Sequence, residues 1–158
     1  MVAGGRNRQA RLRGRVDCVP AAVGRRKSKL RFAASGLASA AASDAGEIEV
    51  DCLSLDEALG GEPATYLKMD IEGAEIDALL GASAALRHGP LVAACTYHTQ
   101  DHLWRVPLCL RRLTPEGRLA LRPYRVDGFD VVCYSIPPDR ASSADEENRE
   151  ELCHSSAS

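Results

Sequence analysis

The sequence is poor in aromatic side chains, in long hydrophobic runs and in net charge. Phe, Trp and Tyr make up 4% of its 158 residues, so a core must be built from Ala, Leu and Val. No stretch approaches the roughly 20 apolar residues of a membrane span, and the start of the chain lacks the apolar segment of a secretory signal. The net charge of -2 excludes a protein whose whole surface binds nucleic acid. We therefore expect one cytoplasmic domain with no membrane span.

Clustered cysteines are also absent. The six cysteines are Cys18, Cys52, Cys95, Cys109, Cys133 and Cys153. They are widely spaced and form no C-x-x-C pair, whereas a zinc site needs Cys or His ligands close together. We therefore expect no metal. All but Cys109 and Cys153 lie in apolar, strand-like runs, which favours reduced, buried thiols in an intracellular protein.

Charge is distributed unevenly along the chain. Residues 1–31 contain ten Lys or Arg and one acid, whereas the remainder contains ten bases and twenty-one acids. A basic arm over residues 1–15 could touch nucleic acid or an anionic membrane. No aromatic residue is interleaved for base stacking, so a solvated arm is the simpler interpretation and we expect no nucleic-acid partner. Residues 138–158 are acidic and Ser-rich, which predicts a disordered tail.

Between these ends the pattern alternates between strands and helices. Strands are expected over residues 16–23, 29–33, 47–53, 65–71, 91–97, 118–124 and 130–136, and helices over 54–59, 73–89 and around 107–113. The second and third strands, and also the last two, are expected to form antiparallel hairpins. Pro107 is expected in the first turn of its helix. This order predicts an α/β fold with an at least partly parallel sheet.

Two polar residues follow neighbouring strands of this sheet. Such sheets bind ligands at the carboxyl ends of their strands, where we expect Asp70 and His98. The Asp70 carboxylate could hold a ligand amine or hydroxyl, and His98 could accept a proton, although a structural hydrogen-bonding role stays open for both. His88 and His102 are expected at the surface, and Asp101 is expected as a helix N-cap.

Three further acids surround the start of the expected helix 73–89. Glu72, Glu75 and Asp77 are explained by the favourable field at a helix N-terminus, which stabilises each acid there by about 0.3–1 kcal/mol. A ligand-binding role stays open for Glu72. Gly73 permits either a close backbone approach to a ligand or a plain turn.

Several stretches carry a family resemblance. The run VDCLSLDEAL…YLKMDIEGAEIDALLGASAAL, followed by TYHTQDHLWRVPLCLRRL and LRPYRVDGFDVVCYSIP, resembles the FkbM family of S-adenosylmethionine-dependent methyltransferases over residues 16–137. The resemblance implies a class I methyltransferase sheet, a Rossmann-like arrangement with strand order 3-2-1-4-5-7-6 and a C-terminal antiparallel hairpin. It also implies methyl transfer to a small-molecule hydroxyl acceptor, a sugar or another secondary metabolite.

The resemblance also assigns roles to particular positions. It implies that S-adenosylmethionine is bound by Ala21, Ala22, Asp70, Glu72 and Gly73. The two alanines would lie near the adenine, and the others near the methionine part or the acceptor. Asp70 and His98 would be the catalytic residues, with His98 flanking the acceptor.

The first two strands of the family are not recognisable in this sequence. These are the central strands, so we expect an incomplete sheet in which the strand 65–71 has an unpaired edge and the strand 16–23 has no partner. Residues 46–137 are then the best-formed part, with residues 1–45 mobile or folded over the open edge. We expect weak cofactor binding or none, and self-association through that edge. A non-catalytic binding module, or an anion-binding module built on the basic arm, stays an alternative.

Overall fold

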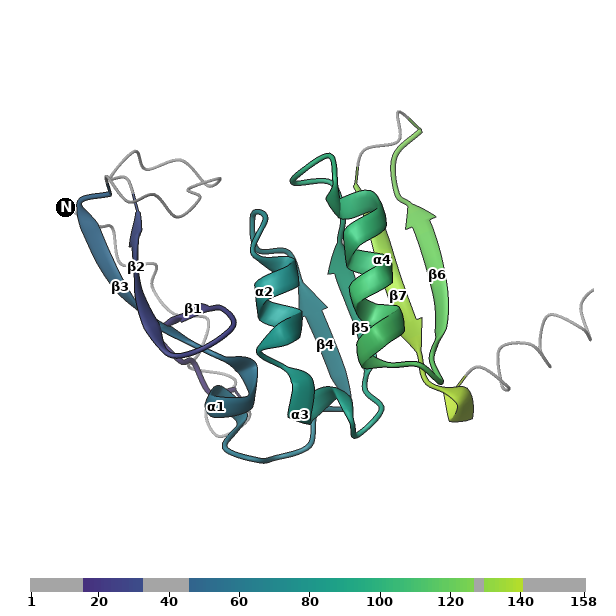
Figure 1. Ribbon diagram of the computed structural model, residues 1–158, viewed down its shortest axis with the longest axis horizontal. Coiled ribbons are helices and arrows are strands. Elements are labelled where there is room, and N and C mark those ends of the chain that lie inside the picture. Colours follow the sequence, from purple (N-terminus) through teal and green to yellow (C-terminus); the bar gives the residue numbers. More distant parts are fainter. Residues whose placement is uncertain (1–15, 33–45, 127–129, 141–158) are drawn as a thin grey trace, which may run out of the picture.

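The computed structural model describes residues 16–32, 46–126 and 130–140, which form an α/β arrangement with two mixed sheets (Figure 1). Sheet A has the order β1 (Ala22–Val23), β3 (Ile48–Leu53), β2 (Ser28–Phe32). Sheet B has the order β4 (Tyr66–Met69), β5 (Leu91–Cys95), β7 (Val131–Ile136), β6 (Arg118–Pro123). The helices are α1 (Leu55–Leu59), α2 (Glu75–Leu80), α3 (Ser83–Leu86) and α4 (His102–Leu113).

Sheet A contains one parallel and one antiparallel pair. The expected hairpin is confirmed, because β2 runs antiparallel to β3 with Phe32 opposite Ile48. The expectation that the first strand has no partner is wrong, because β1 pairs in parallel with β3. This strand is also much shorter than the 16–23 expected. Pro20 has no N–H to donate to a sheet, and Val19 before it is exposed.

Sheet B runs in the order β4-β5-β7-β6, which is the order that the resemblance implies for its last four strands. β4 and β5 are parallel, β5 and β7 are antiparallel, and the C-terminal hairpin of β6 and β7 is confirmed. β4 lies at the end of this sheet, and its other edge has no strand partner among the residues that the structure describes. One edge of sheet B is therefore open on the side of sheet A.

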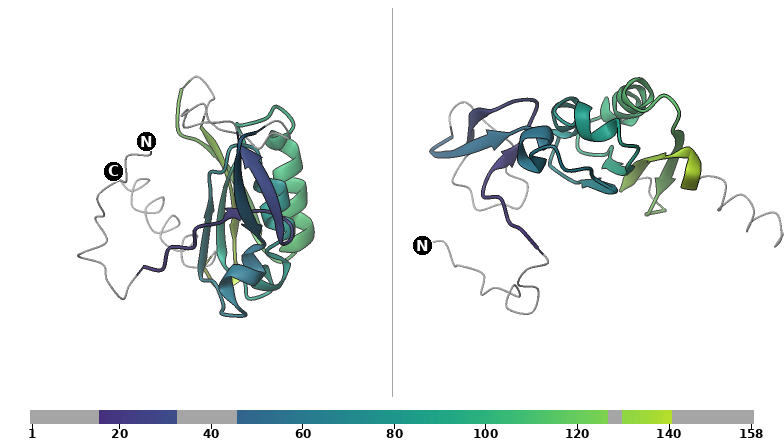
Figure 2. Two further views of the ribbon diagram at one scale, coloured as in Figure 1. Left: turned by 90° about the vertical axis from the view of Figure 1, so that its left-hand side faces the viewer. Right: turned by 90° about the horizontal axis from the view of Figure 1, so that it is seen from below.

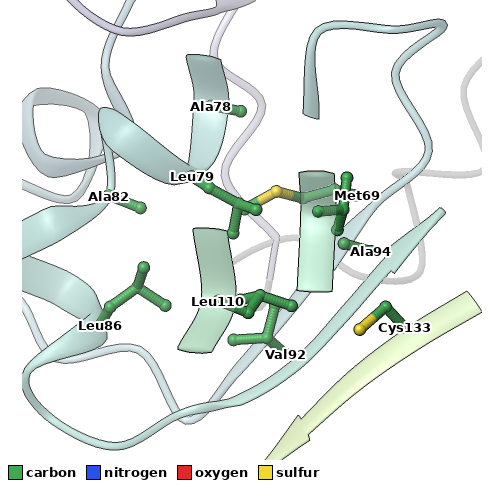
Figure 3. Close-up of a cluster of buried hydrophobic side chains, with 10 residues drawn as sticks. Met69, Ala78, Leu79, Ala82, Leu86, Val92, Ala94, Leu110 and Cys133 are labelled. Atoms are coloured by element: carbon green, nitrogen blue, oxygen red, sulfur yellow. The ribbon is translucent and has the colours of Figure 1, made fainter. Parts of the chain in front are cut away.

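The core lies between sheet B and the helices, which cover one of its faces (Figure 2). Its buried side chains are Met69, Ala78, Leu79, Ala82, Leu86, Val92, Ala94, Val106, Leu110 and Cys133, most of which Figure 3 shows. No aromatic residue belongs to this cluster, in keeping with the composition of the chain.

The single helix expected over residues 73–89 is wrong, because the chain forms two short helices with a break at Gly81. The Gly81 carbonyl accepts a hydrogen bond from the Asp56 N–H at 3.0 Å instead of continuing the helix. The Asp56 carboxylate then accepts from the N–H groups of Ala84 and Ala85, each at 2.8 Å. The first N–H groups of α3 therefore donate to a carboxylate on α1, a contact between distant segments that periodicity does not reveal.

Helix α4 begins five residues before the expected 107–113. Its buried residues His102, Val106 and Leu110 recur every four positions, so they share the face of the helix that is turned to the core. Pro107 therefore lies inside the helix and not in its first turn, which corrects the expectation. The hydrogen bond that it cannot donate would end at the carbonyl of Leu103, so the helix lacks one backbone bond there.

The cysteine prediction is confirmed in part. Cys52, Cys95 and Cys133 are buried and form no disulfide within the described part of the chain, but Cys18 is exposed because the apolar run around it does not form a strand. Cys153, the basic arm and the tail from residue 141 lie outside the described residues. None of the helices in the described part of the chain is long and apolar enough to cross a membrane.

Candidate functional site

A tight turn joins β4 to α2 and gathers three carboxylates. Glu72 has φ 54° and Gly73 has φ 100°, so two successive residues adopt the left-handed region. For Glu72 this conformation costs about 1–2 kcal/mol, since only glycine adopts it freely. The turn reverses the chain so that Asp70 and Glu72 on the loop and Glu75 at the start of α2 all face the end of β5. Strain of this kind in a loop commonly marks a functional site.

Glu75 is the centre of this site. Its side chain is completely buried, and its Oε1 accepts a hydrogen bond from the Ile71 N–H at 3.0 Å. The same oxygen lies 2.8 Å from Nδ1 of His98. Its second oxygen lies 3.1 Å from Nδ1 of His102. This last contact has an ion-pair distance without the alignment of a hydrogen bond, and neither atom has another partner among the described residues.

His98 connects the buried Glu75 to the two exposed carboxylates. Its Nδ1 faces Glu75, whereas its Nε2 lies 3.3 Å from Oδ1 of Asp70 and 3.9 Å from Oε2 of Glu72. The His98 side chain is only 8% exposed, but those of Asp70 and Glu72 are 40% and 41% exposed. The Nε2 edge of the ring therefore faces the open side of the site.

Asp70 is held in its ionised form by donors on sheet B. Burial raises the pKa of this carboxyl, but hydrogen bonds from Tyr97, Cys95 and Lys68 outweigh burial and leave the pKa below its usual range. The Tyr97 hydroxyl donates to Oδ1 at 2.9 Å, and Lys68 Nζ lies 3.4 Å from Oδ2. The same bond to Asp70, together with burial, raises the pKa of Tyr97 well above its ordinary value. Asp70 is therefore an anion at neutral pH.

A cavity of about 850 Å³ lies between sheet A and the start of α2. Its walls come from residues 21–26, 28, 30, 32 and 52 on one side and 71–74 and 77 on the other. Four of the five residues predicted to bind the cofactor line it, namely Ala21, Ala22, Glu72 and Gly73. Glu72 also lies beside His98, so this side chain joins the cavity to the histidine.

Asp70 faces a different hollow, on the face of sheet B that the helices leave uncovered. This cavity of about 510 Å³ is lined by Asp70 together with all four tyrosines of the chain, Tyr66, Tyr97, Tyr124 and Tyr134. The hydroxyls of the last two form a hydrogen bond with each other. Alternate residues of a strand point to opposite faces, so Lys68 and Asp70 point here while Met69 points into the core.

The structure thus brings the predicted pair Asp70 and His98 together with Glu72. It corrects two other expectations. His102 is 4% exposed and belongs to the site, not to the surface. Glu75 does more than favour a helix N-terminus, because it is buried between two imidazoles. Its place on the same helical face as the buried residues three and four positions later could have revealed it.

The other two expectations on polar residues had different outcomes. His88 is exposed, as expected. Asp101 precedes α4, but its carboxylate forms no capping bond and binds the Thr99 hydroxyl at 2.7 Å and Arg105 at 2.6 Å instead. Among the residues that the structure describes, no group of three or more His, Cys, Asp or Glu side chains has the arrangement of a metal site.

Comparisons with known proteins give a consistent assignment. The family model for the methyltransferase FkbM domain matches residues 11–106. The chain is similar to the crystal structure of a methyltransferase FkbM from Methylobacillus flagellatus KT, with 23% sequence identity and a TM-score of 0.63. That match covers 80% of this chain but 30% of the other, so the chain spans less than a third of the length of that protein. No curated protein matches the chain. Because the family model covers more than half of its residues, this chain belongs to the FkbM methyltransferase domain family.

Proposed function

We propose that this chain carries part of an S-adenosylmethionine-dependent O-methyltransferase that acts on a hydroxyl of a sugar or another secondary metabolite. Sheet B is then the 4-5-7-6 part of a class I sheet, and β1 is its third strand. The observation that carries the proposal is the 850 Å³ cavity, which collects Ala21, Ala22, Glu72 and Gly73 from distant parts of the sequence beside His98.

The residues present fit the cofactor. The cavity has the size of sites that enclose molecules of this class, which are about 300–1,000 Å³. Ala22, Leu30 and Phe32 give it an apolar wall suited to adenine, and Glu72 gives it a carboxylate suited to an amine or a sulfonium. The positive φ of Gly73 favours glycine there, although a Cβ would make only an ordinary contact of 3.5 Å with the Thr99 side chain, and glycine leaves this backbone open to a ligand.

The chemistry assigned to the chain is proton removal and orientation. S-adenosylmethionine, when bound, supplies a methyl group activated by a positively charged sulfur. His98 would accept the proton of the acceptor hydroxyl at Nε2, and the methyl group would pass from sulfur to the hydroxyl oxygen, leaving S-adenosylhomocysteine. The Asp70 carboxylate, 3.3 Å from Nε2, stabilises the imidazolium that results. Fixing the hydroxyl against the methyl group supplies much of the acceleration in transfers of this kind.

Binding of the demethylated product, S-adenosylhomocysteine, tests the cofactor part of the proposal. We expect weak binding, seen by NMR as shifts at Ala22, Glu72 and Gly73, because β4 lacks a strand on its open edge among the described residues. The Glu72→Gln variant should reduce these shifts, and Glu62→Gln, at an exposed position away from the cavity, should not. Shifts elsewhere, or none at millimolar ligand, would refute the assignment. A micromolar dissociation constant would instead show that the cofactor pocket is complete in this chain.

A second candidate is a non-catalytic binding module, which the open edge of β4 favours. Its backbone groups on that side have no strand partner among the described residues, and an exposed edge strand readily pairs with another chain. We propose self-association by this edge. Sedimentation velocity at rising concentration should then show a dimer, whereas a monomer at every concentration would contradict it.

A further inference from the structure

We propose that Glu75 is a positioning residue that keeps the proton of His98 on Nδ1, so that Nε2 is the nitrogen that exchanges protons with the acceptor. This rests on the proposed function only for the identity of the acceptor. The geometry of the pair stands on its own. Helix α2 holds Glu75, the end of β5 leads to His98, and the start of α4 holds His102, so three elements converge on one carboxylate.

The burial of Glu75 is the first argument. No other Asp, Glu, Lys or Arg side chain is buried in the described part of the chain, and Glu75 is 0% exposed. A buried carboxyl group is costly unless its oxygens receive hydrogen bonds. Oε1 receives one from the Ile71 N–H, and the remaining partners are the two imidazoles. A buried Glu75 carboxylate therefore needs a histidine N–H that donates a hydrogen bond to it.

The hydrogen bond between His98 and Glu75 is the second argument. Two Nδ1 atoms face the two oxygens of one carboxyl group, at 2.8 Å for His98 and 3.1 Å for His102. Only the 2.8 Å contact between His98 Nδ1 and Oε1 is aligned as a hydrogen bond, whereas the His102 contact is an ion-pair distance. A carboxylate can only accept, so an imidazole that is hydrogen-bonded to it must donate, as the Ile71 N–H does. The proton of His98 therefore lies on Nδ1.

The direction of the ring is the third argument. With Nδ1 turned inward to Glu75, Nε2 points to Asp70 and Glu72, and Glu72 lines the 850 Å³ cavity. A ring held by Nδ1 cannot rotate and offers one nitrogen to the open side. In the absence of Glu75 the proton could lie on either nitrogen, and a neutral ring that carries it on Nε2 cannot accept a proton there.

A merely structural role for Glu75 predicts a different outcome from a positioning role. If the carboxylate only bound the Ile71 N–H, Glu75→Gln would keep that bond through its carbonyl and leave both histidines unchanged. In the positioning role the amide oxygen stays with Ile71 and His98, and the NH₂ group faces Nδ1 of His102. His102 must then accept and move its proton to Nε2, while His98 keeps Nδ1–H.

The test is ¹⁵N NMR of the histidine rings in the whole chain, which needs neither cofactor nor acceptor. Spectra recorded above about pH 8, where an ordinary imidazole is neutral, distinguish a protonated from a bare nitrogen. We expect Nδ1–H with a bare Nε2 at His98 and Nδ1–H at His102, and a proton on Nε2 of His98 at this pH would overturn the role proposed for that nitrogen. Glu75→Gln should switch His102 alone, and the matched control Glu62→Gln, at an exposed carboxyl group, should switch neither.

Each result decides one of the two proposals. A bare Nδ1 at His98 in the unaltered chain overturns the positioning role, and this measurement needs no variant to fold. In a folded Glu75→Gln variant, loss of Nδ1–H at His98 overturns it as well, because the amide oxygen still accepts from this ring. If the expected tautomers are found but S-adenosylhomocysteine does not bind, the positioning of His98 holds while the methyltransferase proposal fails.

Discussion

Gly81 sets how closely sheet A approaches the helices, and its replacement by alanine tests this directly. A Cβ at Gly81 would lie 2.2 Å from the Gly24 carbonyl oxygen and 3.1 Å from the Cα atom of Arg25. Carbon and its non-bonded neighbours normally stay about 3.5–4.0 Å apart, so the two backbones must separate by more than about 1 Å. The φ of Gly81 is -81°, which any residue adopts, so the clash is the only new strain.

The expected loss of stability follows from two contacts. Overpacking of a close contact costs about 1–3 kcal/mol. The Asp56 N–H to Gly81 carbonyl bond of 3.0 Å lies at the same place, and its weakening adds about 0.5–1.5 kcal/mol. We expect Gly81→Ala to lower the free energy of unfolding by about 2 kcal/mol or more, which in a chain of this size lowers the melting temperature by about 4 °C or more.

A local readout shows whether sheet A has moved. Cys52 on β3 is 2% exposed, and its sulfur would be 2.7 Å from a Cβ at Gly24, so the backbone at Gly24 covers this thiol. Peptide-resolved labelling with a thiol reagent should therefore show faster modification of Cys52 in Gly81→Ala. The control is Gly60→Ala, where a Cβ has nothing within 4 Å but φ is +59°. It should cost about 1–2 kcal/mol through backbone strain and leave Cys52 protected. An unfolding free energy within about 0.5 kcal/mol of the unaltered chain, with Cys52 still protected, would refute the close approach.

Two further predictions concern Asp56 and the Tyr97–Asp70 hydrogen bond. Asp56→Ala should lower the free energy of unfolding by about 0.5–2 kcal/mol in urea denaturation, because α3 loses the carboxylate that binds its first N–H groups. The control Asp51→Ala, at an exposed site, should change this free energy little. An unchanged urea midpoint would contradict that role. Tyr97→Phe removes a donor that lowers the pKa of Asp70, so the pKa should rise in a ¹³C carboxyl titration. A depressed pKa of Asp70 stabilises the fold at pH values above the ordinary pKa of the acid, and this stabilisation is lost as the pH falls through the depressed value. The variant should therefore lose less stability on acidification than the unaltered chain. The same Asp70 pKa in both proteins would rule out the hydrogen bond.

The sequence predicted most of the elements because their signals are local. The helix expected over 54–59 is α1, where Ser54 and Glu57 form reciprocal bonds at the start and Gly60 ends the helix in the left-handed conformation. The two hairpins follow from alternating polar and apolar residues. The prediction of one helix over 73–89 was wrong because the structure of this segment depends on contacts between distant segments. Its break depends on hydrogen bonds to Asp56, which lies 25 residues before Gly81 in the chain.

The candidate site divides in the same way. Asp70, Glu72 and His98 were accessible to sequence reasoning because the ends of neighbouring strands meet at one edge of a sheet. Glu75 and His102 were not assigned to it, since an acid at a helix start has a sufficient local explanation in the helix field and a lone histidine is most simply placed at the surface. Only burial distinguishes the two explanations, and burial depends on what packs against the helix.

The sequence by itself determined the α/β class, the four strands of sheet B and the pair of polar residues at their ends, because each depends on residues within a few positions of one another. The tertiary structure alone decided that β1 finds a partner in β3, that Asp70 and Glu72 face separate cavities, and that one buried carboxylate holds two histidines. These three facts depend on contacts between segments far apart in the chain. The free energy of such contacts comes from burial and from hydrogen bonds that exist only once the sheets and helices have packed.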